Sequence, residues 1–152
     1  MQIKSLLFLA TAILTVWNAA LIWMVQVMCY PLWPMVGSAN FRSYHLAWWH
    51  SVWWTFITAG LALIGSILLL FKRPQYFPRW AAVAAVSAQI VSLAVTLAFW
   101  APLQASLSTA DGLDLSGFHT LMWTHWFRVV LIWIPAIVMT QALVQRISHL
   151  PE

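Results

Sequence analysis

Residues 46–71 read LAWWHSVWWTFITAGLALIGSILLLF and contain no Asp, Glu, Lys or Arg. At about 1.5 Å of rise per residue, a helix of this length exceeds the roughly 30 Å thickness of the hydrocarbon core of a bilayer. A run this long and this apolar is typical of a membrane-spanning helix. The sequence therefore predicts a membrane protein.

Three more long apolar runs follow the same pattern, at about residues 3–28, 80–100 and 118–144. The chain has 152 residues, of which 63% are hydrophobic and 7% are charged. Such a composition cannot be buried inside a globule that faces water, so it indicates a multi-pass membrane protein. We predict an all-α fold, a four-transmembrane-helix bundle, in which residues 1–152 form a single integral membrane domain. The first run has no small-residue cleavage site and is predicted to remain as the first span.

The basic residues indicate how the bundle lies in the membrane, because cytoplasmic loops carry an excess of Lys and Arg. Most of this charge falls on the side that holds both termini: Lys4, Lys72, Arg73, Arg79 and Arg146. The opposite loops hold Arg42, Asp111 and Asp114. We therefore predict cytoplasmic termini in a multi-pass protein of a bacterial inner membrane. We attribute the net charge of +4 to the basic residues that orient the protein in the membrane, and we expect no nucleic-acid partner.

The composition excludes several kinds of chemistry. The carboxylic side chains are Asp111, Asp114 and Glu152, and all of them lie outside the predicted spans. A carboxylate-bridged diiron site, a paired-carboxylate mechanism and a carboxylate proton relay are therefore excluded. The lone Cys29 excludes an internal disulfide and a multi-cysteine metal site. Histidine chemistry remains, namely proton transfer by imidazole, haem ligation or a His/Met copper site.

Ionisable residues inside the spans are the best indication of function, because their placement in a bilayer is costly. His50 and His125 are expected at similar depth, within roughly 6 to 11 Å of the outer boundary, and Arg128 at about 15 Å. His125 and Arg128 share a helix face at a spacing of three residues. We predict a functional site in which His50, His125 and Arg128 are the catalytic residues.

The other histidines are predicted to have structural roles, and two amides are candidates to interact with Arg128. His45 lies about 140° around the helix axis from His50, so both cannot point straight into one site. We interpret His45, His119 and His149 as interfacial or hydrogen-bonded structural side chains. Arg128 has no carboxylate within any predicted span, so its charge has to be met by a backbone carbonyl, an amide, a water-filled cavity or an anionic ligand. The amides expected at its depth are Asn18 and Gln89.

Twelve tryptophans far exceed ordinary usage. An aromatic belt at the membrane interface explains those near the predicted helix ends, such as Trp33, Trp80 and Trp100. Deeper tryptophans are predicted to line a pocket for a flat apolar ligand: Trp17, Trp53, Trp54 and Trp133. The predicted cofactor-binding set consists of His50, His125, Arg128, Trp54 and Trp123.

The cofactor remains open among haem b, copper and none. His50 and His125 are the predicted metal ligands in the first two cases. Haem would use one or both imidazoles, with Arg128 or Arg42 meeting a propionate and tryptophans against the ring. A copper site would add ligands from among His45, Met28, Met35 and Met122.

Two short segments resemble a known family. Residues 99–107, FWAPLQASL, and residues 123–128, WTHWFR, are similar to the third-to-fourth-span signature of the small four-helix membrane proteins related to anthrone oxygenase. The segment from residue 30 to residue 45 is similar to an early loop in relatives of that group. The resemblance implies a site at His125, Arg128 and Trp123, framed by Pro102 and Gln104. The high tryptophan content and the presence of His50 depart from the family pattern.

The sequence thus predicts an integral membrane enzyme that acts on a small hydrophobic substrate in a Trp-lined pocket containing His and Arg near the outer leaflet. The expected reaction is an oxygenation or an isomerisation. Styrene oxide isomerase, another small four-span enzyme, contains haem and shares this architecture without a common motif. The alternative function is that of a non-catalytic accessory subunit of a larger membrane complex. In both cases we expect contact with membrane lipid, and either a homo-oligomer or association with partner chains.

Overall fold

The structure is a computed structural model that describes residues 3–148. The first helical rod contains α1 (Ile3–Met24), the π-helical η1 (Val25–Cys29) and the 3-10 helical η2 (Tyr30–Met35). The second is α2 (Ser38–Lys72), and the third contains α3 (Arg79–Val95), the π-helical η3 (Thr96–Trp100) and α4 (Ala101–Ser106). A hairpin of β1 (Ser108–Thr109) and β2 (Gly112–Leu113) leads into α5 (Leu115–Ser148). His149 and Glu152 lie outside the described residues.

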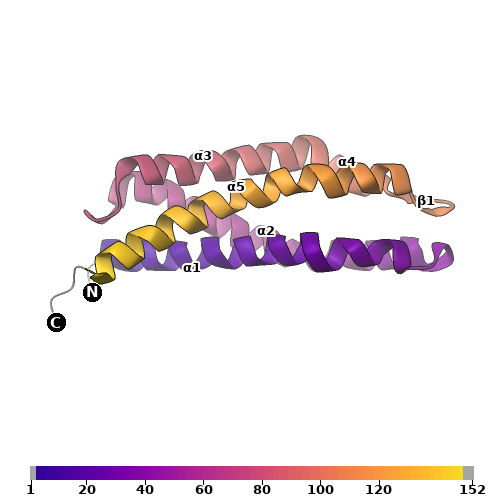
Figure 1. Cartoon of the computed structure of the whole chain (residues 1–152), viewed down its shortest axis with the longest axis horizontal. Coiled ribbons are helices and arrows are strands. Elements are labelled where there is room, and N and C mark those ends of the chain that lie inside the picture. Colours follow the sequence, from indigo (N-terminus) through magenta and orange to yellow (C-terminus); the bar gives the residue numbers. More distant parts are fainter. Residues whose placement is uncertain (1–2, 149–152) are drawn as a thin grey trace.

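Within residues 3–148 the chain forms four long, apolar rods, each long enough to cross a membrane: 3–35, 38–72, 79–106 and 115–148. They lie side by side along the long axis of the molecule (Figure 1). The start of α1 and the end of α5 lie at one end of the bundle, and the hairpin lies at the other. Packing of α1 against α2 and α5, and of α3 against α2 and α5, closes the ring. The predicted all-α four-helix bundle is confirmed.

Two of the rods continue past a proline and beyond the predicted span ends at residues 28 and 100. Pro31 and Pro102 each lie two residues beyond a π-helical segment. A proline ring clashes with the carbonyl group four residues earlier in a regular α-helix. In both rods that carbonyl group belongs to the π-helical segment, whose wider turn leaves room for the ring. As a result Tyr30 and Gln104, which fall in predicted loops, are buried inside the bundle.

Two cores of buried apolar side chains fill the ends of the bundle. The core nearest the termini is rich in alanine: Phe8, Ala12, Leu69, Phe77, Ala81, Ala82, Ala85, Met139 and Ala142. The core nearest the hairpin is rich in aromatic residues: Val25, Tyr30, Trp33, Phe41, Trp100, Leu107, Phe118 and Leu121. The polar residues predicted to share one depth lie between these two cores.

Small residues in the inner half of α2 contact more than one neighbouring helix. Gly65 of α2 lies against Thr11 of α1. Across the interface with α3, Gln89 Nε2 donates a hydrogen bond to Ser66 Oγ at 2.7 Å. The packing of α2 against α3 is nevertheless less extensive than that of α1 against α2 or of α3 against α5. The interface between α2 and α3 is therefore the loosest part of the ring.

We expect Gly65→Ala to destabilise the bundle and Gly60→Ala to leave its stability nearly unchanged. A Cβ at Gly65 would overlap the side chain of Thr11, a β-branched residue that is stiff within a helix. A Cβ at Gly60 would meet nothing within 4 Å. The first substitution is expected to cost roughly 1–3 kcal/mol. Thermal unfolding of both variants in detergent measures the difference, and equal midpoints would contradict the close approach of α1 and α2.

Candidate functional site

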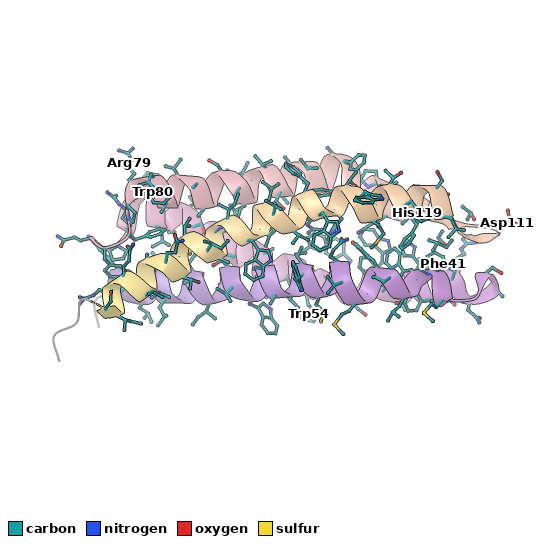
Figure 2. The ribbon with its side chains drawn as sticks, viewed as in Figure 1. Phe41, Trp54, Arg79, Trp80, Asp111 and His119 are labelled. Atoms are coloured by element: carbon teal, nitrogen blue, oxygen red, sulfur yellow. The ribbon has the colours of Figure 1, made fainter. Side chains whose placement is uncertain are left out.

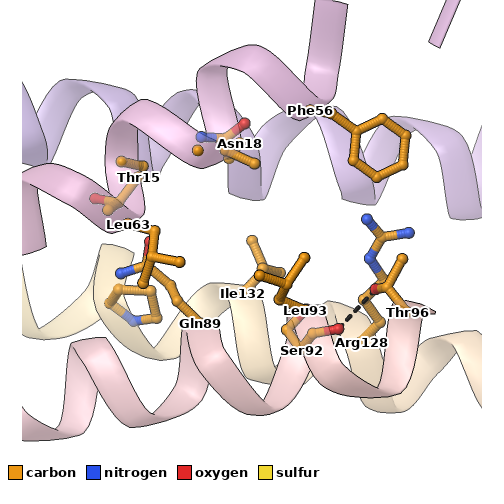
Figure 3. Close-up of a pocket in the computed structure, with 14 residues that line it drawn as sticks. Thr15, Asn18, Phe56, Leu63, Gln89, Ser92, Leu93, Thr96, Arg128 and Ile132 are labelled. Carbon is orange, nitrogen blue, oxygen red and sulfur yellow. Dashed lines mark hydrogen bonds between the residues drawn. The ribbon is translucent and has the colours of Figure 1, made fainter. Parts of the chain in front are cut away.

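A cavity of about 220 Å³ lies between the two cores and is lined by residues from all four rods. Figure 3 shows its lining side chains around a central space. Most of the lining is apolar, and its polar members are Thr15, Asn18, Gln89, Ser92, Thr96 and Arg128. Asn18, Gln89 and Arg128 all line this central cavity, but Gln89 and Arg128 lie toward opposite ends of it, so the three do not share one depth (Figure 3).

Arg128 brings a positive charge to the central cavity. Its side chain extends from α5 toward Phe56 of α2 (Figure 3). Its Nε atom is buried and has no hydrogen-bond partner among residues 3–148. No Asp or Glu occurs in the rods formed by residues 3–35, 38–72, 79–106 and 115–148. The guanidinium carbon lies 5.9 Å from the centroid of the Trp100 ring, within the range of a cation–π contact.

The two amides that were expected at the depth of Arg128 form hydrogen bonds with residues other than Arg128. Asn18 Nδ2 donates to the carbonyl oxygen of Leu14 at 2.8 Å, and Asn18 Oδ1 accepts from the Thr58 hydroxyl at 2.9 Å. Gln89 Nε2 donates to Ser66 Oγ. These bonds fix both amides in place without neutralising the guanidinium. The charge of Arg128 is therefore left for a ligand or for water in the cavity.

His125 lies one helical turn from Arg128 and is completely buried. Its Nδ1 atom is 2.8 Å from Oε1 of Gln26, and Gln26 Nε2 donates to the carbonyl oxygen of Met122 at 3.1 Å. A carbonyl oxygen can only accept, so this contact sets which end of the Gln26 amide faces His125. Nδ1 must then carry the hydrogen and donate to Gln26. In the neutral imidazole this leaves Nε2 with a free lone pair.

The free Nε2 of His125 is buried without a hydrogen-bond partner in the described part of the chain. Two aromatic rings lie edge-on to the imidazole, with centroids at 5.0 Å for Tyr30 and 5.8 Å for Trp100. The Tyr30 hydroxyl accepts a hydrogen bond from Gln104. We call Gln26, Tyr30, Trp100, Gln104 and His125 the His125 cluster. An unpaired basic nitrogen held in fixed rings is a candidate for proton transfer.

Arg128 connects the His125 cluster with the central cavity. A small void of about 20 Å³, large enough for one water molecule, is lined by Tyr30, Gln104 and Arg128. Arg128 and Phe56 line both this void and the central cavity. The guanidinium group therefore lies between a buried base and a space that a ligand can occupy.

The structure does not bring His50 to His125 and Arg128. His50 is exposed on the surface of α2, whereas His45 on the inward face of that helix is 3% exposed. The ranking of His50 above His45 is therefore corrected. The reason is the start of α2 at Ser38, which places His45 two turns inside the helix and on the face that points inward.

The tryptophans expected deepest in a pocket lie on the outside of the bundle. Trp54 is 74% exposed and Trp123 is 79% exposed, and Figure 2 shows Trp54 at the outer edge of the molecule. Trp17 and Trp53 are exposed too, and Trp133 is partly exposed. The buried tryptophans are instead Trp33 and Trp100, which were assigned to the interface. A helix face that points to lipid is as apolar as a buried one, so hydropathy did not separate the two sets.

The described residues do not form a metal site with two histidine ligands. Among residues 3–148 no three His, Cys, Asp or Glu side chains converge on a possible metal position. His125 Nε2 is covered, and the rings of Tyr30 and Trp33 lie in contact between His125 and His45. Met28 and Met35 are exposed. The predicted ligand pair of His50 and His125 is therefore not assembled.

Three residues of the His125 cluster, two glutamines and one tyrosine, were not predicted from the sequence to have a direct role in the site. Gln26 and Tyr30 were not proposed as site residues, and Gln104 entered only as part of a loop. All three are polar side chains close to the Tyr-Pro or Ala-Pro steps of apolar rods. That position is the signal that could have identified them, since a buried polar side chain needs a partner.

Comparison with protein-family models, curated proteins and solved structures finds no match for this chain. The similarity to relatives of anthrone oxygenase therefore rests on the short motifs alone. Of the residues selected by those motifs, Gln104, His125 and Arg128 lie around the site described above. Trp123 faces outward.

Proposed function

We propose that this protein is an integral membrane enzyme that acts on a small hydrophobic substrate bound in the central cavity. The observation that carries the proposal is the Arg128 guanidinium, which reaches into an apolar cavity without a carboxylate partner in the spans of residues 3–148. A charge in this position is costly, so it favours a ligand that offers an electron-rich oxygen. A flat ketone or phenol has both the apolar body and the oxygen that such a cavity requires.

The chemistry of this pair of residues is proton abstraction from a carbon that is made acidic by conjugation with, or proximity to, a carbonyl group. The lone pair of His125 Nε2 accepts a proton from carbon, and negative charge develops on the substrate oxygen. Arg128 stabilises that oxyanion in a site that excludes bulk water. His125 does not line the central cavity, and its Nε2 atom is covered. We therefore expect the ring of Tyr30 or Trp100 to move when substrate binds, so that the substrate comes within reach of Nε2.

The resulting enolate leads to either of the two predicted reaction types. Return of the proton to another atom of the enolate gives an isomer of the substrate. Reaction of the enolate with dioxygen at a CH2 group gives a second ketone and one molecule of water. The same base and the same cation serve both reactions, and neither step needs a metal ligand from the described residues.

Anthrone is a suitable probe, because it is flat and apolar and its acidic CH2 group is conjugated with a ketone. We expect the purified protein in lipid nanodiscs to accelerate deuterium exchange at this CH2 group. If the enzyme is an oxygenase, it will also consume dioxygen and form anthraquinone. The absence of exchange, of oxidation and of saturable binding of anthrone would contradict the proposal.

The absorption spectrum of the purified protein tests the alternative with haem. The proposed chemistry uses His125 as a base, which is incompatible with Nε2 as an axial ligand. A Soret band that disappears in the His125→Asn variant would therefore contradict the proposed role of His125 and support the haem hypothesis.

A hydrophobic substrate is proposed to reach the central cavity from the lipid, through the loose interface between α2 and α3. Gly60 and Leu93 both line the cavity and are both exposed on the outside of the bundle. We expect Gly60→Phe to slow anthrone binding by roughly tenfold or more, because the ring would close this opening. The matched control is Ile64→Phe, at an exposed position of α2 that does not line the cavity. Equal binding rates in both variants would contradict the lateral entry route.

We further propose that both termini are cytoplasmic in a bacterial inner membrane, which places the His125 cluster beneath the outer leaflet. Support comes from the basic residues of the 72–79 connection and from Lys4 and Arg146, which lie toward one end of the bundle. Figure 2 shows Arg79 at that end and Asp111 at the other. Labelling of cysteines introduced at positions 72 and 111 with an impermeant reagent tests this orientation.

The second candidate function is that of an accessory subunit of a larger membrane complex. It is favoured by the large aromatic side chains on the outside of several rods: Trp17, Trp53, Trp54, Trp80 and Trp123. Such surfaces suit contact with lipid or with partner helices, either of another protein or of a second copy of this chain. Native mass measurement after gentle solubilisation distinguishes these partners, and a homo-oligomer free of other chains would contradict the accessory role.

A further inference from the structure

A second cavity, of about 520 Å³, lies at the hairpin end of the bundle. It is formed by the first turns of α2, by α4 and by β1, and we call it the rim cavity. Its polar lining consists of Arg42, His45, Ser108 and Thr109, and its apolar lining consists of Leu46, Trp49, Ala105 and Ala110. It shares no lining residue with the central cavity, so any ligand it binds is independent of the proposed enzyme activity.

Two polar atoms of the rim cavity are buried without partners. These atoms are Nε2 of His45 and Oγ of Ser108, and neither has a hydrogen-bond partner within residues 3–148. Buried polar atoms are almost always paired with protein, water or a ligand. Both atoms belong to residues that line the rim cavity, so a small shift of either side chain would let a ligand in the cavity complete its hydrogen bonds.

The imidazole of His45 is packed among aromatic rings. It is stacked between the rings of Phe41, at 5.4 Å and 17°, and Trp48, at 6.2 Å and 10°. The ring of Trp33 lies edge-on to it at 5.2 Å. This aromatic frame makes His45 a preorganised donor or acceptor at the wall of the rim cavity.

Ser108 is fixed against α2 by the hairpin. Ser108 pairs with Leu113, and Thr109 pairs with Gly112. Gly112 has a φ angle of 109° and lies so close to α2 that an added Cβ would be 2.9 Å from Cα of Ser38. A glycine is required there both for the backbone conformation and for this close approach. The hydroxyl group of Ser108 therefore keeps a defined position relative to Arg42 and His45.

We propose that the rim cavity binds a phosphate group. Arg42 supplies a cation, and the Ser108 hydroxyl and an Nε2 hydrogen of His45 supply two further donors, whereas no carboxylate lines the cavity among the described residues. Arginine with neutral hydroxyl and imidazole donors suits the several acceptor oxygens of a phosphate. The phosphate belongs to a phospholipid headgroup or to a free anion. The adjacent Leu46, which is 54% exposed, and Trp49 offer an apolar surface on which the glycerol and acyl part of a lipid would lie.

Native mass measurement of the full-length protein in detergent tests the phosphate site. The delipidated protein is titrated separately with phosphatidylglycerol, with diacylglycerol and with inorganic phosphate. We expect one bound phosphatidylglycerol per chain and weaker binding of diacylglycerol, which has the same acyl chains without the phosphate. Tight binding of inorganic phosphate alone would instead assign the same site to a free anion.

Variants then locate the binding site. Arg42→Gln is expected to lower the affinity for the phosphate-containing ligand by about tenfold or more, the effect of one charge-assisted hydrogen bond. Ser108→Ala removes a single oxygen and is expected to lower that affinity by a few fold without disturbing the hairpin. Arg79→Gln, an equally exposed arginine at the other end of the bundle, is the control and is expected to bind as the wild type does.

The affinities of these variants distinguish a specific phosphate site from general electrostatic attraction to the protein. Equal losses in Arg42→Gln and Arg79→Gln would overturn the proposal, because they would show attraction to net charge alone. Binding of neither phosphatidylglycerol nor inorganic phosphate would also overturn it. Retention of wild-type affinity in Ser108→Ala together with loss in Arg42→Gln would remove Ser108 from the site and contradict the proposed donor set.

Discussion

Replacing Arg128 with leucine is expected to make the empty protein more stable while abolishing its function. The guanidinium group lies between rods without a carboxylate partner in the described spans, and its Nε atom has no hydrogen bond there. A charged residue near the centre of a membrane helix costs roughly 2.5–3.5 kcal/mol, and leucine removes that cost. The same change removes the group that would stabilise a substrate oxyanion, which is worth about 100-fold to 1,000-fold in turnover.

Thermal unfolding in detergent and anthrone turnover, measured on the same preparation, test this prediction. Arg128→Lys is the matched variant, because it keeps the charge but loses the planar fork of donors. We expect it to retain the stability of the wild type and part of the activity. A leucine variant that is less stable than the wild type, or one that keeps full turnover, would show that Arg128 has a structural partner and is not held for a ligand.

Replacing His125 with asparagine is expected to abolish turnover and to leave substrate binding largely intact. The Asn amide nitrogen takes the place of Nδ1 and keeps the hydrogen bond to Gln26, which otherwise loses its partner. The asparagine side chain has no atom at the position of Nε2, so the variant lacks the proposed base. The loss of a general base typically lowers the rate by about 100-fold to 10,000-fold. The expected result is therefore a fall in kcat with little change in KM.

His119→Asn is the matched control, because His119 lies on α5 within two turns of His125 and is exposed. Its turnover and stability should equal those of the wild type. The His125→Gln variant moves the amide toward the position of Nε2 and gives up the contact with Gln26, so it should lose stability as well as activity. If His125→Asn turned over anthrone at the wild-type rate, His125 would be a structural residue only.

The number and identity of the spans could be predicted from local composition. A run without charge and longer than the hydrocarbon core has few alternatives to a membrane helix, whatever its neighbours are. Counting along such helices placed Asn18, Gln89 and Arg128 in the middle part of the bundle, and all three line the central cavity. Helix ends were less predictable, because Pro31 and Pro102 stop a regular α-helix but not one that widens into a π-helical turn.

The direction in which each side chain points was much harder to predict. In water, the buried face of a helix is apolar and the outer face is polar, so the pattern reveals the inward side. In lipid both faces are apolar, and the pattern is lost. His50 and Trp54 were therefore assigned to the interior although they are exposed, and His45 and Trp100 were given minor roles although they are buried.

The amino-acid sequence alone settles the class of the protein, the four crossings, and the absence of any carboxylate in them, because each of these depends on residues that are near one another along the chain. Contacts between rods settle the chemistry of the site. The amide of Gln26 determines which nitrogen of His125 is free, and these two residues are separated by 99 positions. The placement of Arg128 in a shared cavity likewise depends on how all the rods pack together, and packing of apolar helices in lipid rests on shape and close contact, which hydropathy does not encode.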